Sequence, residues 1–221
     1  VTADERTSAT HDYGPQYSTH AMSNTEEDVF LSSLKLGAAK VLNTALVFGG
    51  TTLFARTIGA DQLGIYFLFE GLLGLFAVFT NFGLSGALEK RLSEGVDHEQ
   101  YLASAAVLKG ALVILISLVV IVARGRINEY LNADLALLLI VAIVLNEAGR
   151  LFFYTLRGEI RVGDTSTIHA TRQFMWVAVG GALTIFGFGY LAPLYGFLCG
   201  LGAVLALSYL MVDVRIGRPS V

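Results

Sequence analysis

Five charged residues stand inside long apolar stretches of the sequence, namely Lys40, Glu70, Lys109, Glu147 and Arg150. A charge at the centre of a bilayer costs roughly 2.5–3.5 kcal/mol on insertion scales, so such groups normally face protein or a water-filled cavity. Cations in a cavity could bind an anionic group. The acids could couple to ions or form structural ion pairs with the cations. We therefore treat all five as candidate site residues.

Helical spacing places other polar or small residues beside these charges. One face of the second apolar stretch carries Glu70, Gly74, Ala77 and Asn81, and the first and fourth stretches have similar stripes. Three polar faces predict a bundle of helices around a hydrated interior.

Each charge also has an ordinary structural explanation. Lys40 and Lys109 lie about two turns from predicted helix starts and could extend to the membrane surface. Glu147 and Arg150 lie three residues apart and could form only a structural ion pair. Glu70 lies near the predicted interface, where it could be solvated or could pair with Lys40. The sequence leaves these alternatives open.

The composition predicts what must position these residues. Of the 221 residues 54% are hydrophobic and only 15% are charged, and the mean hydropathy is +0.64, whereas soluble domains have roughly 25% charged residues. Apolar runs near the ~20 residues that span a bilayer predict six transmembrane helices. The predicted spans are 34–56, 63–84, 102–123, 135–156, 173–192 and 194–212.

The remaining segments complete the predicted organisation. Residues 1–29 carry six acidic side chains against one arginine, which predicts a disordered acidic cytoplasmic tail. Residues 30–212 form the six-helix lobe, and residues 213–221 form a short cytoplasmic tail. With both termini cytoplasmic, nine loop cations lie inside and three outside, Arg172 being counted among the nine.

Details of helix packing are also predicted. A tight turn at Ala192 and Pro193 would join the last two helices, and Gly196-x-x-x-Gly200 would let helices pack closely. Tyr66 and Trp176 lie near predicted span ends, where aromatic side chains anchor helices at the membrane surface.

Several kinds of chemistry find no support. No basic run suggests nucleic acid as a partner, and the single cysteine, Cys199, lies in an apolar run. We recognise no phosphate-binding loop, metal-ligand motif or nucleophile arrangement. We therefore expect no catalytic residue, no cofactor and no metal site, and we expect that the chain is not an enzyme.

Two motifs carry a resemblance. Residues 55–66 read ARTIGADQLGIY, and residues 81–91 read NFGLSGALEKR. The first resembles the turn between the first two helices of the polysaccharide-biosynthesis flippases, in the multidrug/oligosaccharidyl-lipid/polysaccharide exporter superfamily. The second is similar to that family's end of helix two and the cytoplasmic loop. The resemblance extends, mainly by helix count and hydropathy, over residues 30–212.

The resemblance implies a fold and a function. The family has two six-helix lobes that rock about a central cavity, and this chain resembles the amino-terminal lobe. It implies a multi-pass plasma-membrane flippase that moves a polyprenyl-phosphate-linked sugar across the bilayer for surface polysaccharide or glycoprotein assembly. A second lobe would come from another chain or a second copy. Lys40, Lys109 and Arg150 would then be substrate-binding contacts for the head group, with Glu70 and Glu147 as coupling residues or a structural ion pair.

Other functions remain open. One is an ion-coupled multidrug-type exporter, which would favour acids in the cavity, whereas here three cations stand against two acids. Another is a non-transporting membrane subunit or a truncated remnant, which the length of one lobe suggests. A membrane glycosyltransferase or phosphatase would need catalytic residues that we do not find.

Overall fold

The described residues form helices. A computed structural model describes residues 19–93, 98–158 and 162–211, and its regular elements are all α-helices. The chain divides into two units, residues 1–38 and 39–221. Helix α1 begins in the first unit and ends in the second, which holds the other helices. The helices are α1 (Thr19–Thr57), α2 (Ala60–Asn81), α3 (Leu84–Ser93), α4 (His98–Val122), α5 (Arg124–Leu131), α6 (Ala136–Gly158), α7 (Val162–Ile185) and α8 (Leu191–Met211).

Four of the described helices are long and apolar enough to cross a membrane. These candidate spans are Ala60–Asn81, Tyr101–Val122, Ala136–Leu156 and Leu191–Met211. They agree closely with four of the six predicted spans, which confirms a helical membrane protein. The first predicted span falls within α1, and the fifth, 173–192, overlaps α7 but runs past its end at Ile185. That these two helices cross the membrane stays a prediction.

The amino-terminal prediction needs a correction. Residues 19–29 were predicted to be disordered, but α1 already begins at Thr19. Each residue added to an existing helix gains a backbone hydrogen bond, so a helix can continue from an apolar run into a polar one. Residues 1–18 and the short carboxyl-terminal tail, 213–221, lie outside the described residues.

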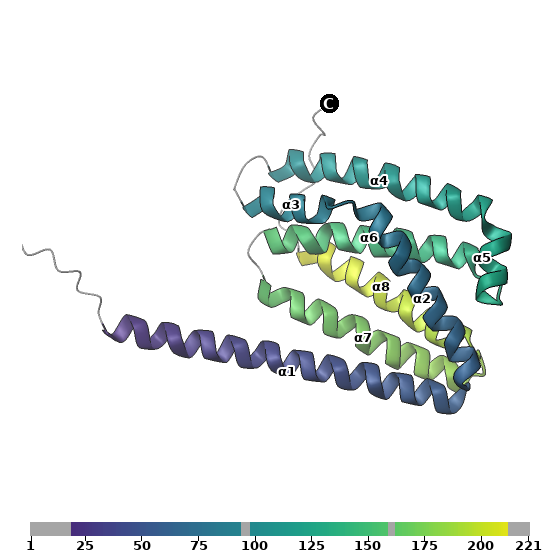
Figure 1. Cartoon of the computed structure of the whole chain (residues 1–221). Helices are drawn as coiled ribbons and strands as arrows, with labels where there is room; N and C mark the ends of the chain where they lie inside the picture. The colour runs from purple at the N-terminus through teal and green to yellow at the C-terminus, as the bar shows by residue number, and fades with distance from the viewer. Residues whose placement is uncertain (1–18, 94–97, 159–161, 212–221) are drawn as a thin grey trace, which may run out of the picture. The chain divides into compact units, whose positions relative to one another are not determined.

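In the second unit, α8 lies between α6 and α7, and α6 also packs against α3 and α4 (Figure 1). The contact between α7 and α8 is close because glycine lines it. A Cβ added to Gly196 would lie 2.6 Å from the carbonyl oxygen of Trp176, and one added to Gly200 would lie 2.8 Å from that of Arg172. The predicted packing role of Gly196 and Gly200 is confirmed.

The turn between α7 and α8 lies earlier than predicted. Helix α7 ends at Ile185, and Gly187 and Gly189 take the positive φ angles of 79° and 53°. Helix α8 then begins at Leu191. The prediction of a turn at Ala192 and Pro193 was wrong because proline is tolerated in the first helical turn, where its missing N–H needs no helical partner.

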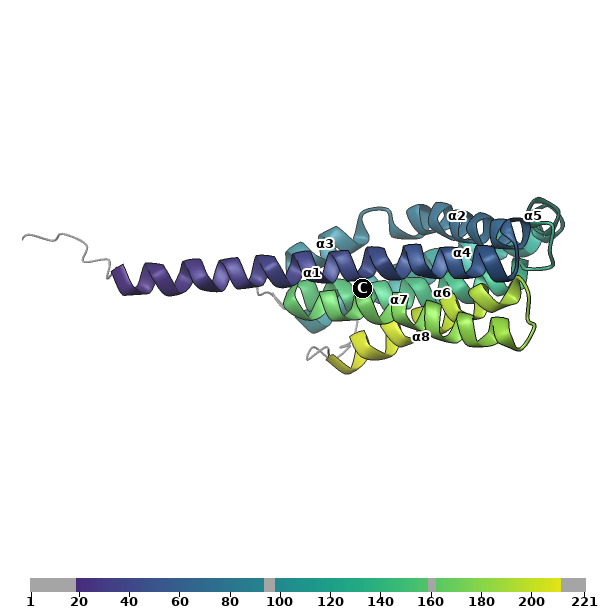
Figure 2. The same ribbon diagram turned by 90° about the horizontal axis from the view of Figure 1, so that it is seen from below.

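Helix α2 ends at a bend. Phe82 and Gly83 have φ angles of 37° and 78°, which is the left-handed region that stops a helix. In Figure 2 the chain passes from α2 into α3 through this short link. Asn81 accepts a hydrogen bond from the Ser85 backbone N–H at 3.3 Å, and another from the Ser85 hydroxyl. The bend brings α3 beside α4 and α6.

An aromatic cluster joins four helices in the core. The Tyr66 ring of α2 stacks on Trp176 of α7, with 5.4 Å between centroids, and meets Phe197 of α8 edge-on. Phe54 of α1 also contacts Trp176. Tyr66 and Trp176 are both buried, so the prediction that they anchor helices at the membrane surface was wrong. Trp176 lies well inside α7, since that helix starts at Val162 rather than near residue 173.

Candidate functional site

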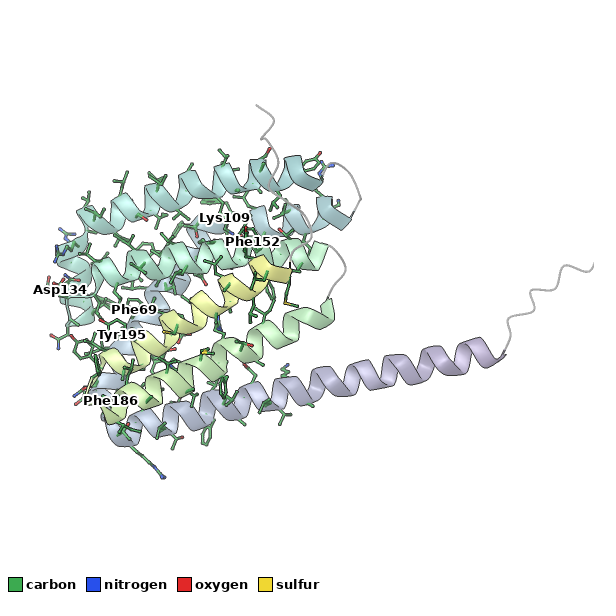
Figure 3. The ribbon with its side chains drawn as sticks, turned by 180° about the vertical axis from the view of Figure 1, so that it is seen from behind. Phe69, Lys109, Asp134, Phe152, Phe186 and Tyr195 are labelled. Carbon is green, nitrogen blue, oxygen red and sulfur yellow. The ribbon has the colours of Figure 1, made fainter. Side chains whose placement is uncertain are left out.

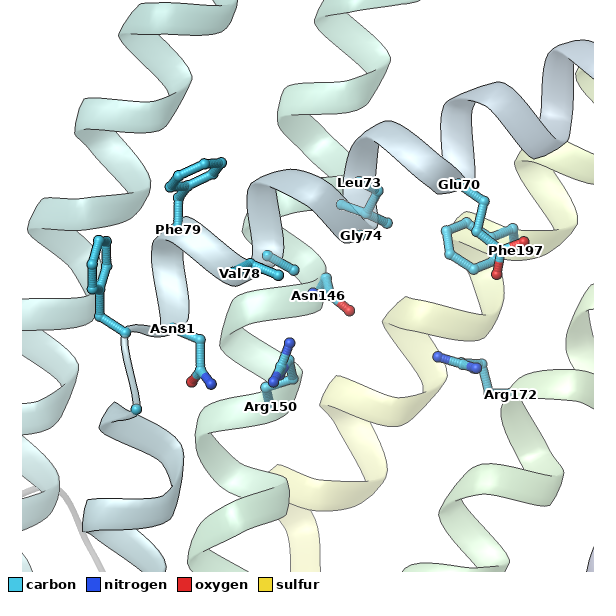
Figure 4. A pocket seen from close by; sticks show the side chains of 13 residues that line it. Glu70, Leu73, Gly74, Val78, Phe79, Asn81, Asn146, Arg150, Arg172 and Phe197 are labelled. Atoms are coloured by element: carbon cyan, nitrogen blue, oxygen red, sulfur yellow. The ribbon is translucent and has the colours of Figure 1, made fainter.

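A polar cavity lies among α2, α6, α7 and α8. It encloses about 530 Å³, which falls in the range of roughly 300–1,000 Å³ typical of ligand pockets. Figure 4 shows its labelled side chains, with Arg150 on α6 and Arg172 on α7 both at the cavity. The polar side chains that line it are Glu70, Asn81, Asn146, Arg150 and Arg172.

The polar stripe predicted on α2 forms one wall. Glu70, Gly74, Ala77 and Asn81 all line the cavity, because their spacing places them on one face of the helix. The exposed side chains of Val78 and Phe79 on α2, and of Phe82 directly after it, also lie at the cavity. The predicted polar face of the second span is therefore confirmed as a cavity wall.

Glu70 lies further along its helix than predicted. It is in the middle of α2, ten residues after the helix begins at Ala60, which is roughly 15 Å along the axis at 1.5 Å per residue. None of the ion pairs among the described side chains joins Glu70 to Lys40. Helix α2 begins three residues before the predicted span, and the depth of Glu70 in the membrane stays a prediction.

Arg172 is the functional candidate that the sequence analysis missed. We counted it as a loop cation, but α7 begins at Val162, so Arg172 lies ten residues inside the helix. Its side chain is partly buried, and its Nε has no hydrogen-bond partner. Asn146 was missed too, although it precedes Arg150 by four residues and so shares its face. Extending the fifth helix towards its amino terminus would have revealed Arg172.

Lys109 and Glu147 form a buried ion pair between α4 and α6. The Lys109 Nζ lies 2.9 Å from Glu147 Oε2, and the two residues are only 4% and 1% exposed. Figure 3 shows Lys109 on α4 beside α6. Lys109 therefore does not extend to the membrane surface, and neither residue lines the polar cavity.

Glu147 also contacts two residues that line the cavity. Glu147 Oε1 accepts a hydrogen bond from Asn146 Nδ2 at 3.0 Å and lies 3.8 Å from an Arg150 guanidinium nitrogen. The expected pairing of Glu147 with Arg150 is thus present but long. Lys109 Nζ also donates to the Ser85 hydroxyl at 3.4 Å. Glu147 therefore lies between the buried Lys109 and two residues of the cavity wall, Asn146 and Arg150.

Lys40 lies apart from this network. Its side chain is exposed on α1 and is not among the residues that line the cavity. Thr44, one turn further along α1, donates its hydroxyl hydrogen to the Lys40 backbone carbonyl. The Thr44 hydroxyl therefore has its hydrogen-bond partner within the helix. Of the three predicted substrate-binding cations, the structure therefore brings Arg150 to the cavity, with Lys109 linked to it through Glu147.

Among the described residues no group of three or more histidine, cysteine or acidic side chains could hold a metal ion. The described helices and their cavity define a membrane protein with a charged interior site. The cations come from two different helices, and the acid comes from a third. Such a site suits binding or transport of a charged group.

Comparison with known proteins identifies the family. The model of a family described as "Polysaccharide biosynthesis protein" matches residues 32–220. The chain therefore belongs to this family, and the resemblance of its motifs to polysaccharide-biosynthesis flippases is confirmed. A relative from Haloferax volcanii, named "Probable low-salt glycan biosynthesis flippase Agl15", is 41% identical over 193 residues, or 87% of this chain.

The match covers 41% of that relative's own length, so the chain spans about two fifths of it. No solved structure matches the chain. The family, the relative's name and the apolar helices agree on a membrane protein of polysaccharide biosynthesis.

Proposed function

We propose that this chain is one lobe of a flippase that moves a lipid-linked oligosaccharide across the plasma membrane. Arg150 and Arg172 carry the proposal, because they line one cavity together with a single acid, Glu70. A phosphate or diphosphate head group is expensive to move through hydrocarbon, and two guanidinium groups would compensate its charge. The name of the Haloferax volcanii relative supports a glycan as cargo.

The polyprenyl chain would stay in lipid while the head group enters the cavity. A volume of about 530 Å³ suits a phosphate and its first sugars rather than a long glycan. The cavity has exposed apolar side chains at one wall, namely Val78, Phe79 and Phe82. In our proposal a second lobe, from another chain or another copy, faces this wall, and the two lobes alternate access to the two membrane faces.

The proposed orientation has both termini in the cytoplasm. Moving Arg172 from a loop into α7 leaves eight loop cations inside against three outside. This bias still favours cytoplasmic termini. It would place the bend between α2 and α3, with Lys90 and Arg91, at the cytoplasmic face.

The test is transport by the purified native assembly. Its mass should exceed that of the 23.7 kDa chain by a second lobe. In proteoliposomes that contain lipid-linked oligosaccharide, Arg150→Ala and Arg172→Ala should each slow translocation at least about tenfold. Arg124→Ala removes a cation outside the cavity and serves as the control.

Lys40 and Lys109 complete this series. Lys109→Ala should reduce transport through its effect on Glu147, and Lys40→Ala should have the smallest effect because its side chain is exposed. Unchanged transport in both arginine variants would overturn the proposal. A native chain that purifies alone and moves no lipid-linked sugar would instead support a non-transporting membrane subunit. Export of small cationic compounds would support a multidrug-type exporter.

A further inference from the structure

The carboxylate of Glu147 is divided between two environments. Its Oε2 lies 2.9 Å from Lys109 Nζ, where both residues are almost fully buried. Its Oε1 faces Asn146 at 3.0 Å and Arg150 at 3.8 Å. Asn146 and Arg150 both line the polar cavity, whereas Glu147 does not. One buried anion therefore contacts a sealed cation on one side and the cavity wall on the other.

The two cations compete unequally for this anion. The contact with Lys109 is short, and Lys109 is held further by its 3.4 Å hydrogen bond to Ser85. The contact with Arg150 is long, and the Arg150 side chain keeps 31% of its surface exposed. In the low dielectric of a buried site such differences in distance strongly affect the strength of pairing. Lys109 holds Glu147, and Arg150 stays available to the cavity.

We propose that Glu147 is an internal anion that competes with an anionic ligand for Arg150, and that Lys109 is the positioning residue that limits this competition. The inference rests on the proposed function, in which Arg150 receives a phosphate-bearing head group. When the ligand binds, Arg150 exchanges its long contact with Glu147 for the phosphate, and Lys109 keeps the charge of Glu147 compensated. The Lys109–Glu147 pair thereby sets the affinity of the cavity for anions.

This arrangement predicts opposite effects of two variants. In Lys109→Met, Glu147 keeps Arg150 as its remaining cation, so Arg150 is held and the ligand binds about tenfold more weakly. In the double variant Lys109→Gln/Glu147→Gln, the competing anion is gone and no unpaired charge is left. Arg150 is then fully available, and the ligand binds about fivefold more tightly than to the unmodified chain.

The experiment is a binding titration of the purified 221-residue chain in detergent with farnesyl diphosphate, a short polyprenyl diphosphate. Farnesol, which lacks the charge, is the matched ligand control. The double variant Arg124→Gln/Asp134→Asn is the matched protein control, because it removes an ion pair whose residues do not line the cavity. Circular dichroism of each variant checks that its helices are retained.

The expected result is weaker binding in the single variant and tighter binding in the double variant, with farnesol unaffected in both. If the Lys109–Glu147 pair were merely structural, both variants would bind the ligand more weakly than the unmodified chain or equally well. That result would overturn the inference. If Lys109→Met does not fold, the double variant alone tests the inference: tighter binding of farnesyl diphosphate supports it, and unchanged or weaker binding overturns it. Weak binding that Arg150→Ala does not alter would overturn the proposed function instead, since the inference predicts changes only in an Arg150-dependent affinity.

Discussion

Two ion pairs in this molecule have similar distances but different surroundings. Lys109 and Glu147 approach to 2.9 Å inside the helix bundle, where their side chains are 5% and 1% exposed. Arg124, the first residue of α5, and Asp134, in the link that follows α5, approach to 3.1 Å, and their side chains are 48% and 69% exposed. Distance alone does not separate them. Their burial differs, and burial determines how much each pair contributes to stability.

The exposed pair stabilises a turn. Arg124 donates to both carboxylate oxygens of Asp134, and Asn128 contacts the same carboxylate. Asn128 also accepts hydrogen bonds from the backbone N–H groups of Leu135 and Ala136, which start α6. The pair thus joins the start of α5 to the link between α5 and α6. The buried pair instead connects α4 with α6 directly behind the cavity wall.

The largest expected effect comes from breaking the buried pair. Lys109→Met leaves the Glu147 carboxylate without its short contact and should lower the free energy of unfolding by about 3–5 kcal/mol. Denaturant unfolding in mild detergent, followed by circular dichroism, measures this loss. A change below about 1 kcal/mol would mean that burial does not distinguish the two pairs.

Removing both charges should cost much less. Lys109→Met/Glu147→Leu replaces the pair with apolar side chains, and replacing a buried pair in this way is often neutral or stabilising by about 1–4 kcal/mol. The double variant should therefore be at least as stable as the unmodified chain in the same unfolding measurement. A double variant as unstable as Lys109→Met would contradict the account, because it would show that packing and not charge compensation causes the loss.

A substitution in the uncharged contact between α7 and α8 should cause a loss of stability of intermediate size. Gly196→Ala places a Cβ against the Trp176 carbonyl and the Gly180 backbone, at distances of 2.6–2.8 Å. Overpacking of this kind should lower stability by about 1–3 kcal/mol. Gly202→Ala on the same helix meets no atom within 4 Å and is the matched control. Equal stability of the two variants would contradict the close contact.

The smallest effect should come from the exposed pair. Arg124→Gln should change the free energy of unfolding by no more than about 1 kcal/mol, because water and salt screen an exposed pair. Raising the salt concentration should remove most of that difference, whereas it should leave the loss in Lys109→Met nearly unchanged. Unfolding at low and high salt checks both statements. A salt-resistant loss in Arg124→Gln would weaken the contrast between the pairs.

The sequence predicts the helices well and their rotations poorly. Hydropathy places α2, α4, α6 and α8 within a few residues, because span length is limited by the thickness of the bilayer. The cavity face of α2 follows from the spacing of Glu70, Gly74, Ala77 and Asn81 alone. The partner of Lys109 does not follow in this way. It depends on which faces of α4 and α6 meet, and that is decided by packing across the bundle.

Arg172 shows a second limit. A hydropathy window ends where polar residues begin, so it excluded Arg172 from the fifth span, although the helix continues to Val162. A helix that lines a polar cavity carries polar residues for that reason. A hydropathy window therefore underestimates the length of such a helix at the polar part that lines the cavity.

In the proposed function, Arg150 and Arg172 together bind a phosphate-bearing lipid head group. The most direct test is the affinity of the purified chain for farnesyl diphosphate, compared among the unmodified chain, Arg150→Ala, Arg172→Ala and the double variant, with Arg124→Ala as control. Each single variant should bind farnesyl diphosphate at least about tenfold more weakly. The double variant should bind it no better than it binds farnesol, and the control should be unchanged. Equal affinity in all of them would contradict the proposed function.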